Sequence, residues 1–300
     1  MSATATAAAV EAPTRKIALR TKGDDMGAIV RLFAPFAERK PPYDPSEAAE
    51  MLKPFIFLDI FNMQRAKFAG FNANPNNLHP HSGLATLTFV TGGTVYFEDT
   101  SGESGVMQEG AVEWLHAAGG AWHGGAPGEN GCRGFQLWVA LPPEEELGAV
   151  ESIYLPKDQV PKIGPAAVLL GSYQGVSSLL SAPSDVTYLG VRLKAGERWR
   201  YEPAPTHNVG WMATCIGQVR VPETVDEREL VAFEPGNGPI DFEAVSDVEF
   251  VVGSAVKHPF PLSIGHYSVH TTQQALQQGE ARIAEIKERL TAEGRLAPFQ

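Results

Sequence analysis

The sequence predicts an all-β protein made of two antiparallel β domains followed by a single helix. One observation is composition, because 30 Gly and 23 Pro among 300 residues predict many turns and few long helices. A second is the recurrence of short apolar runs between glycine-containing turns, which is typical of a β-sandwich or barrel. A third is length, since 300 residues suit two domains of about 150 residues each.

The first half of the chain contains a series of strand signals. The segment LKPFIFLDIF is largely apolar, so it is expected to be a strand buried on both faces. Gly92 and Gly93 are expected to join two strands as a hairpin, because glycine adopts the positive φ angles that tight hairpin turns need. A turn at Gly110 is expected to join the next two strands. The strand-forming segments are 16–19, 52–61, 84–90, 94–99, 105–115 and 134–141.

A linker and a repeated pattern divide the chain. PPEEE at 142–146 is an expected linker, stiffened by its prolines and solvated by its glutamates. It separates an expected first barrel domain over 16–145 from a second over 146–300. In the second, GWMATCIGQVRV (210–221) resembles GLATLTFVTGGTVYF (83–97), about 125 residues earlier. We therefore expect an internal duplication of a β domain.

The C-terminal segment has a different, helical periodicity. Thr271 or Thr272 can cap the start of a helix expected at about 272–294. This amphipathic helix is expected to pack on the flank of a barrel. Its apolar residues recur at helical spacing: Leu276, Ile283, Ile286 and Leu290.

Composition also excludes several classes of function. Lys and Arg number 24 against 35 Asp and Glu, and the net charge of −11 disfavours direct nucleic-acid contact and anionic membrane surfaces. No apolar run reaches 18 residues, so no transmembrane helix is predicted. Cys132 and Cys215 are the only cysteines, which favours a reducing, cytoplasmic location. Residues 1–15 lack the features of a signal peptide and are expected to be a disordered tail.

The histidines suggest a metal site. In His79-Pro80-His81, the proline favours an extended backbone, and residues i and i+2 of an extended segment point to the same side. Both imidazoles can therefore converge on one ion. The preferred third ligand is His123, because the glycines on both sides of it in GGAWHGGAP permit close approach to a crowded site. His116, seven residues earlier, is the competing candidate.

Five sequence blocks resemble the pirin family: FLDIFN, HPHSG, VTGGTVYFED, EWLHAAGGAWHGGAP and GFQLWVALP. Pirins are bicupins, with two β-barrel (jelly-roll) domains and one metal, usually iron, in the N-terminal barrel. The resemblance implies that His79, His81 and His123 are the metal ligands and that the second barrel holds no metal. Iron(II) is the expected metal, and Zn, Ni, Cu and Mn are alternatives because imidazole suits several divalent ions.

The sequence departs from the family pattern beside these histidines. Pirins carry a glutamate two residues after the third histidine, where this chain has Gly125. The family's HPHRGFET is HPHSGLAT here, so Ser82 and Ala85 replace an arginine and a glutamate. Three neutral imidazoles would leave a divalent ion with its full charge, which should lower metal affinity and raise attraction for anionic ligands.

Three interpretations follow from the resemblance. The first is a dioxygenase similar to quercetin 2,3-dioxygenase, acting on a small phenolic, flavonol-like substrate. The second is a metal-dependent regulatory protein that binds a transcription factor or a metabolic enzyme. The third is a degenerate cupin without activity. The sequence therefore leaves open whether the chain is an enzyme, which protein partner it has and its oligomeric state.

Several side chains near the histidines have both a functional and a structural interpretation. Three glutamates could replace the missing carboxylate, although each is expected to be a solvated strand-edge residue. They are Glu98, Glu103 and Glu113. Three tryptophans could line a substrate pocket, although core packing is the preferred interpretation. They are Trp114, Trp122 and Trp138.

Overall fold

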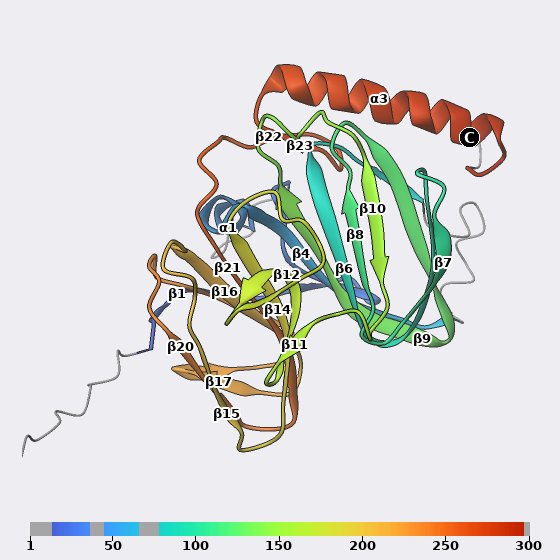
Figure 1. The fold of residues 1–300 in the computed structure, drawn as a ribbon. Helices are drawn as coiled ribbons and strands as arrows, with labels where there is room; N and C mark the ends of the chain where they lie inside the picture. The colour runs from blue at the N-terminus through green and yellow to red at the C-terminus, as the bar shows by residue number, and fades with distance from the viewer. Residues whose placement is uncertain (1–13, 37–44, 66–77, 297–300) are drawn as a thin grey trace, which may run out of the picture.

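The computed structural model describes residues 14–36, 45–65 and 78–296. Most of these residues lie in strands, and two helices occur among them, α1 (Pro45–Leu52) and α3 (Gln273–Ala292). Figure 1 shows two neighbouring β units, with α3 along the outside of the first. The all-β prediction is therefore confirmed, together with the C-terminal helix.

The first half of the chain forms a nine-stranded antiparallel sheet. Its strands are β2 (Asp24–Asp25), β3 (Ile29–Phe33), β4 (Phe55–Met63), β5 (His79–His81), β6 (Leu84–Asp99), β7 (Ser104–Gln108), β8 (Val112–His116), β9 (Ala121–Ala140) and β10 (Glu151–Leu155). The order is β10-β8-β6-β9-β4-β3-β2, while β5 pairs with β9 and β7 pairs with β6. As expected from its apolar sequence, β4 is buried along most of its length.

The expected hairpin at Gly92 and Gly93 is wrong, because β6 continues through both glycines. The pairing of β6 with β9 shifts register on either side of them. Gly93 and Gly131 have φ angles of 73° and 77°, and a Cβ on Gly93 would lie 2.2 Å from the Gly131 carbonyl oxygen. The glycines therefore let two paired strands bend together rather than reverse direction. The predicted turn at Gly110, by contrast, does join β7 to β8.

The second half forms three further sheets. An eight-stranded sheet contains β1 (Ile17–Lys22), β11 (Lys162–Ile163), β12 (Ala166–Tyr173), β13 (Val176–Ser177), β14 (Val186–Leu193), β16 (Val209–Ile216), β19 (Glu229–Phe233) and β21 (Val248–Ala255). A four-stranded sheet contains β15 (Arg198–Tyr201), β17 (Val219–Val221), β18 (Glu223–Val225) and β20 (Ile240–Ala244). The last is a pair, β22 (Ser263–Ile264) and β23 (Val269–His270).

The two large sheets have the same strand order. In the first it is β3-β4-β9-β6-β8, and in the second it is β12-β14-β21-β16-β19. When the two orders are aligned, β6 occupies the same position in its sheet as β16 does in the other. These are the two segments that resemble each other in sequence. Gly217 follows β16 with a φ of 76°, close to that of Gly93 in β6. The arrangement supports the expected duplication.

Strand pairing crosses the domain ranges expected from the sequence. Strand β1, within the expected first domain 16–145, pairs with β19 of the second sheet. Strand β10, within the expected second domain 146–300, pairs with β8 of the first sheet. Each sheet thus gains an edge strand from the other range, and this exchange ties the two halves together. The expected ranges therefore do not coincide with the sheets.

Two local expectations fail where side chains find buried partners. Arg15 lies at the end of the expected tail 1–15, yet it is buried and its guanidinium donates to the Glu234 carbonyl. The rest of that expectation, residues 1–13, lies outside the described residues. Glu146 of the expected solvated linker is also buried, where it accepts hydrogen bonds from the Thr271 backbone N–H and hydroxyl at 2.6 and 2.8 Å.

Helix α3 packs on the first half of the molecule. Thr272 caps its start by accepting a hydrogen bond from the Ala275 backbone N–H. Leu290 and Trp122 share a small apolar cluster, and the Trp122 indole donates to the Ile283 carbonyl at 2.9 Å. The expected position of the helix, on the flank of a β unit, is therefore found. Neither described helix is long and apolar enough to cross a membrane.

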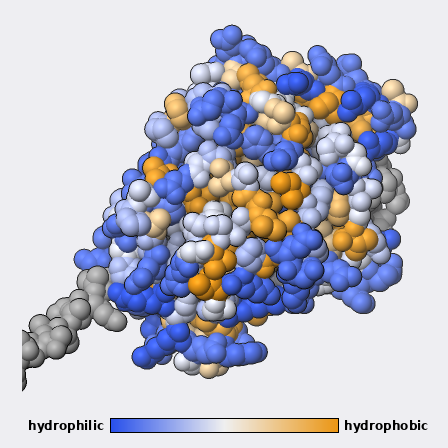
Figure 2. Space-filling model, viewed as in Figure 1, coloured by the Kyte–Doolittle hydropathy of each residue, from blue (hydrophilic) through white to orange (hydrophobic). Residues whose placement is uncertain are grey.

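Most of the surface in the view of Figure 2 is hydrophilic, and apolar residues gather near its centre, where the two β units meet. Beneath the surface, one large apolar core includes residues of both halves, among them Phe55 and Trp114 of the first and Trp211 of the second. The two units are therefore joined by a shared core.

Candidate metal site

The structure brings His79, His81 and His123 together. Strand β5 pairs with β9 so that His79 lies opposite His123, and His81 lies opposite Ala121. The potential ligand atoms of the three histidines all lie within 4.8 Å of one another. Their ring centroids are 4.7 to 5.1 Å apart. The extended His-Pro-His segment therefore directs two imidazoles to the side where the third lies, as its spacing predicts.

His81 is fully buried, and the protein orients its ring. Its Nδ1 lies 3.3 Å from the Tyr267 carbonyl oxygen, to which a protonated Nδ1 donates, and Nε2 has no hydrogen-bond partner. The Trp138 ring meets it edge-on at 4.8 Å. Burial, and then the charges of His79 and His123, hold the pKa of His81 well below its usual value. The ring is therefore neutral near pH 7, with an Nε2 lone pair available to an ion.

The contact with Tyr267 comes from a segment 186 residues away in the chain. Ser82 anchors this segment, because its hydroxyl lies 3.0 Å from both Ser268 Oγ and His270 Nε2. The backbone N–H of Val269 also donates to the Ser82 carbonyl. Tyr267 has a φ of 63°, a left-handed conformation that non-glycine residues adopt at an energetic cost. The surrounding contacts hold the Tyr267 carbonyl in place beside His81.

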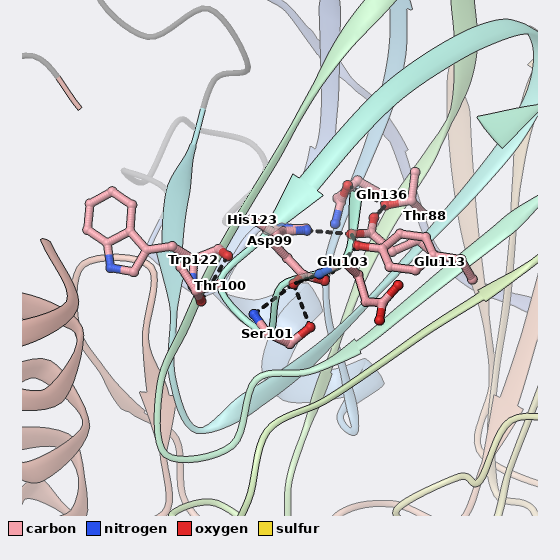
Figure 3. Close-up of polar contacts among 10 residues, drawn as sticks. Thr88, Asp99, Thr100, Ser101, Glu103, Glu113, Trp122, His123 and Gln136 are labelled. Carbon is pink, nitrogen blue, oxygen red and sulfur yellow. Dashed lines mark hydrogen bonds and ion pairs between the residues drawn. The ribbon is translucent and has the colours of Figure 1, made fainter. Parts of the chain in front are cut away.

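His123 is oriented by a carboxylate. Its Nδ1 donates to Glu113 Oε1 at 2.7 Å, as Figure 3 shows, and its buried Nε2 has no partner. Burial acts to raise the pKa of Glu113, but the proximity of His123 and the hydrogen bonds from His123 and Thr88 outweigh it and lower that pKa. Glu113 is therefore ionised. Its buried position contradicts the expectation of a solvated strand-edge residue.

These features fit a metal ion. Two buried Nε2 atoms without partners lie in one cluster, and buried polar atoms in proteins are otherwise nearly always hydrogen-bonded. In both rings the opposite nitrogen contacts an oxygen acceptor, which is the usual support for a metal-binding histidine. Histidine nitrogens suit Zn, Cu, Fe and Ni. Within the described ranges, this is the only group of three or more His, Cys, Asp or Glu with metal-site spacing.

A small cavity lies beside the cluster, with a volume of about 80 Å³. Its polar lining residues include Glu113, His79 and His123. Its apolar lining residues include Phe61, Met63, Val95, Phe97 and Met107. Gly125 also borders it, and a Cβ there would lie 2.9 Å from Val95 Cγ1. The position where pirins carry a glutamate is thus partly filled by a neighbouring valine.

The other candidates lie apart from the cluster. The Nε2 of His116 donates to Glu145 at 3.0 Å, so the competing third ligand is engaged elsewhere. Arg295 donates to Glu98 at 3.0 Å, and Glu103 is exposed, so neither replaces the missing carboxylate.

The three tryptophans lie outside the cavity lining. Trp114 is fully buried in the main core, as the packing interpretation predicts. Trp122 packs under α3 and points away from His123 in Figure 3. Trp138 differs from the other two because its ring contacts a proposed metal ligand, His81. It also stacks on Phe57, with ring centroids 4.1 Å apart.

Sequence reasoning missed Gln136 and Tyr267, and it named Glu113 as a carboxylate that could compensate but expected it to be solvated. Glu113 and Gln136 pair with Thr88 from the strands on its two sides. An alternating pattern of apolar and polar residues identifies strands but does not predict which residues of neighbouring strands are paired. Tyr267 has no sequence signal, because its role depends on a backbone carbonyl brought from the far end of the chain.

Comparisons with known proteins agree with this fold and site. Residues 37–139 match the family model described as Pirin. A pirin-like protein of Caulobacter vibrioides is 30% identical over 216 residues, which cover 68% of this chain and 76% of that protein. Pirin of Rattus norvegicus is 28% identical over 214 residues, which cover 69% of this chain and 67% of the rat protein.

Two solved structures share the fold. A quercetin 2,3-dioxygenase from Acinetobacter baumannii superposes with a TM-score of 0.78 and 18% identity, covering 92% of this chain and 98% of that one. A bacterial pirin from Escherichia coli in complex with nickel(II) gives a TM-score of 0.60 and 18% identity, covering 81% and 98%. At these identities the likeness establishes the architecture, a two-part cupin.

Proposed function

This chain belongs to the pirin family, and we propose that it is a metal-dependent dioxygenase of a small phenolic substrate. His79, His81 and His123 are the proposed ligands of one divalent metal, with iron(II) as the physiological ion. The observation that carries this proposal is the pair of buried, partnerless Nε2 atoms within the histidine cluster, next to a cavity. The names of two structural relatives, a quercetin 2,3-dioxygenase and a nickel-bound pirin, support the same chemistry.

The residues of the chain have distinct tasks in this function. When bound, the metal supplies Lewis-acid and redox chemistry. Tyr267 and Glu113 fix the ring orientation of His81 and His123 and direct both Nε2 atoms into the site. The apolar side chains that line the cavity suit the hydrocarbon part of a substrate. Position 125 offers no side-chain base, so the substrate is expected to enter with its hydroxyl already ionised.

Cavity size narrows the substrate. Sites for drug-sized ligands have volumes of roughly 300–1,000 Å³. The cavity beside the histidines has a volume of about 80 Å³, well below this range. This volume favours a substrate with a single small ring over a three-ring flavonol.

The test is metal content followed by oxygen uptake. The apoprotein is loaded anaerobically with iron(II), desalted and analysed for bound metal. Oxygen consumption is then recorded with catechol, with a single-ring phenol and with quercetin, and His81→Ala serves as the control without the metal site. We expect one iron per chain and faster uptake with a single-ring substrate than with quercetin. Absence of retained iron, or retained iron without uptake on any of the three substrates, would contradict the proposal.

A further inference from the structure

We propose that Glu113 supplies, through His123, the negative charge that the metal site lacks at position 125. Glu113 is a positioning residue in this role, because it contacts the imidazole and not the metal. The inference rests on the proposed metal site.

Glu113 is fixed by three strands. It lies on β8, directly opposite Thr88 of β6, which in turn lies opposite Gln136 of β9. The Thr88 hydroxyl donates to Glu113 Oε2 and lies 2.9 Å from Gln136 Oε1. Glu113 Oε1 accepts from His123 Nδ1 at 2.7 Å and faces the Tyr154 hydroxyl at 3.4 Å. Both carboxylate oxygens are therefore engaged, and the side chain is held toward His123 and not free to become a ligand.

The charge of Glu113 can act through the ring. When the Nδ1–H of an imidazole donates a hydrogen bond to a carboxylate, its Nε2 lone pair becomes a stronger ligand for a metal. Loss of such a carboxylate commonly lowers metal affinity by about 10- to 100-fold. The carboxylate is 4% exposed, so solvent screens little of its charge. A divalent ion on His123 would therefore belong to a site of net charge 1+, the same as with a directly bound carboxylate.

Other acids near the site are committed elsewhere. The Oδ1 of Asp99 accepts from the Ser101 backbone N–H and hydroxyl at 2.7 and 2.6 Å. Its Oδ2 accepts from the Tyr154 hydroxyl at 2.9 Å. Glu98 pairs with Arg295. Of the acids described around the cluster, Glu113 is the one that contacts a proposed ligand.

Position 125 explains why the charge comes from another strand. A side chain at Gly125 would meet Val95 Cγ1 at 2.9 Å and the Tyr96 carbonyl oxygen at 3.3 Å. A Cβ at position 125 is thus crowded by Val95, while β8, which is separated from β9 by β6, offers a buried carboxylate. The two features together describe a site whose negative charge lies one hydrogen bond beyond a coordinating imidazole, instead of directly on the metal.

The first experiment measures metal affinity. Glu113→Gln preserves shape and removes charge, and Glu103→Gln removes a charge from an exposed position of the same half. Dissociation constants for nickel(II) are obtained by competition with a chelator on folded apoproteins. We expect Glu113→Gln to weaken binding by about 10- to 100-fold and Glu103→Gln to leave it within about twofold. Equal affinity of Glu113→Gln and the parent would overturn the inference.

A second measurement separates charge from structural support. In cobalt(II)-loaded protein, azide affinity is followed by the visible spectrum. Loss of the Glu113 charge should raise azide affinity several-fold because the site becomes more positive, whereas simple loosening of His123 would lower both metal and azide affinity. If Glu113→Gln does not fold, Thr88→Val keeps the charge but removes one restraint, and it should weaken nickel binding in the same direction. A parent protein that binds no divalent metal refutes the proposed function, whereas binding unaffected by Glu113→Gln refutes only this inference.

Discussion

The two β units share a strand order but differ in what fills their interiors. In the first, three histidines form a cluster, and two of them, His79 and His123, line a cavity together with Glu113. In the second, aromatic rings fill the space, with Phe242 stacked on Phe250 at 4.9 Å and Trp199 stacked on Phe242 at 5.3 Å. One topology therefore supports either a polar site or a solid apolar core. Side-chain identity, not strand arrangement, decides whether a unit can bind an ion.

The histidines of the two units show the same difference in detail. His207 of the second unit is buried, and both of its ring nitrogens have partners, Ser254 Oγ at 2.7 Å and Asp185 Oδ1 at 3.0 Å. His81 and His123 of the first unit each leave one nitrogen without a partner. A buried nitrogen without a partner is costly unless a ligand satisfies it. His207 is therefore a structural histidine, whereas His81 and His123 combine a nitrogen without a partner with membership of one histidine cluster.

The largest expected effect lies in the apolar unit. Phe250→Ala should lower the free energy of unfolding by about 3–5 kcal/mol, because it removes a fully buried ring and leaves a cavity. Urea denaturation of the apoprotein measures this loss. If the units are as distinct as their interiors suggest, nickel affinity of the folded variant should stay within about twofold of the parent. A large change in nickel affinity would show that the second unit supports the site directly.

The next effect contrasts two buried histidines. His81→Ala should weaken nickel binding by more than about 100-fold, because it removes a proposed ligand, while His207→Ala should leave nickel affinity unchanged. Chelator competition on both folded variants provides the comparison. Equal losses in the two variants would mean that burial of histidine, and not the cluster, governs metal binding.

A carboxylate can be restored to the first unit to sharpen the comparison. Gly125→Glu alone should be strained by contact with Val95, although Gly125 does not have a positive φ angle. In the double variant Val95→Ala/Gly125→Glu, room is made for the side chain, and nickel should be held about 10-fold more tightly than in Val95→Ala. Metal content after a chelator challenge measures this gain. Unchanged retention in the folded double variant would show that residue 125 does not reach the ion.

The smallest expected effect lies at the junction of the units, where the His258 backbone N–H donates to the Lys53 carbonyl. Burial, with the nearby Lys53 charge, lowers the pKa of His258 to about 4. The unfolded chain, with a histidine pKa near 6.5, binds the proton more readily, so stability is lost as pH falls from about 6.5 to 4. His258→Gln should reduce this loss by about 1 kcal/mol. Urea titrations at pH 7 and pH 4.5 compare the two proteins, and identical pH slopes would contradict the prediction.

Local sequence patterns predicted the all-β class, the C-terminal helix and the convergence of His79 and His81. Each depends on residues a few positions apart, so periodicity and proline geometry suffice. The hairpin expected at Gly92 and Gly93 was wrong because the path of the chain at these glycines depends on a distant strand and not on neighbouring residues. Glycine permits a bend as readily as a reversal, and only the partner strand β9 selects between them.

What the sequence by itself determined is therefore the chemistry available: three imidazoles in two short segments, no carboxylate at position 125 and an interior-forming apolar pattern. Only the tertiary structure decided that Glu113 lies buried against His123 and that the Tyr267 carbonyl meets His81. The physical reason is that both contacts depend on strand register and on segments distant in the chain. The strands that pack beside a carboxylate decide whether it is solvated or buried. They also decide whether a backbone carbonyl meets a side chain from another part of the chain.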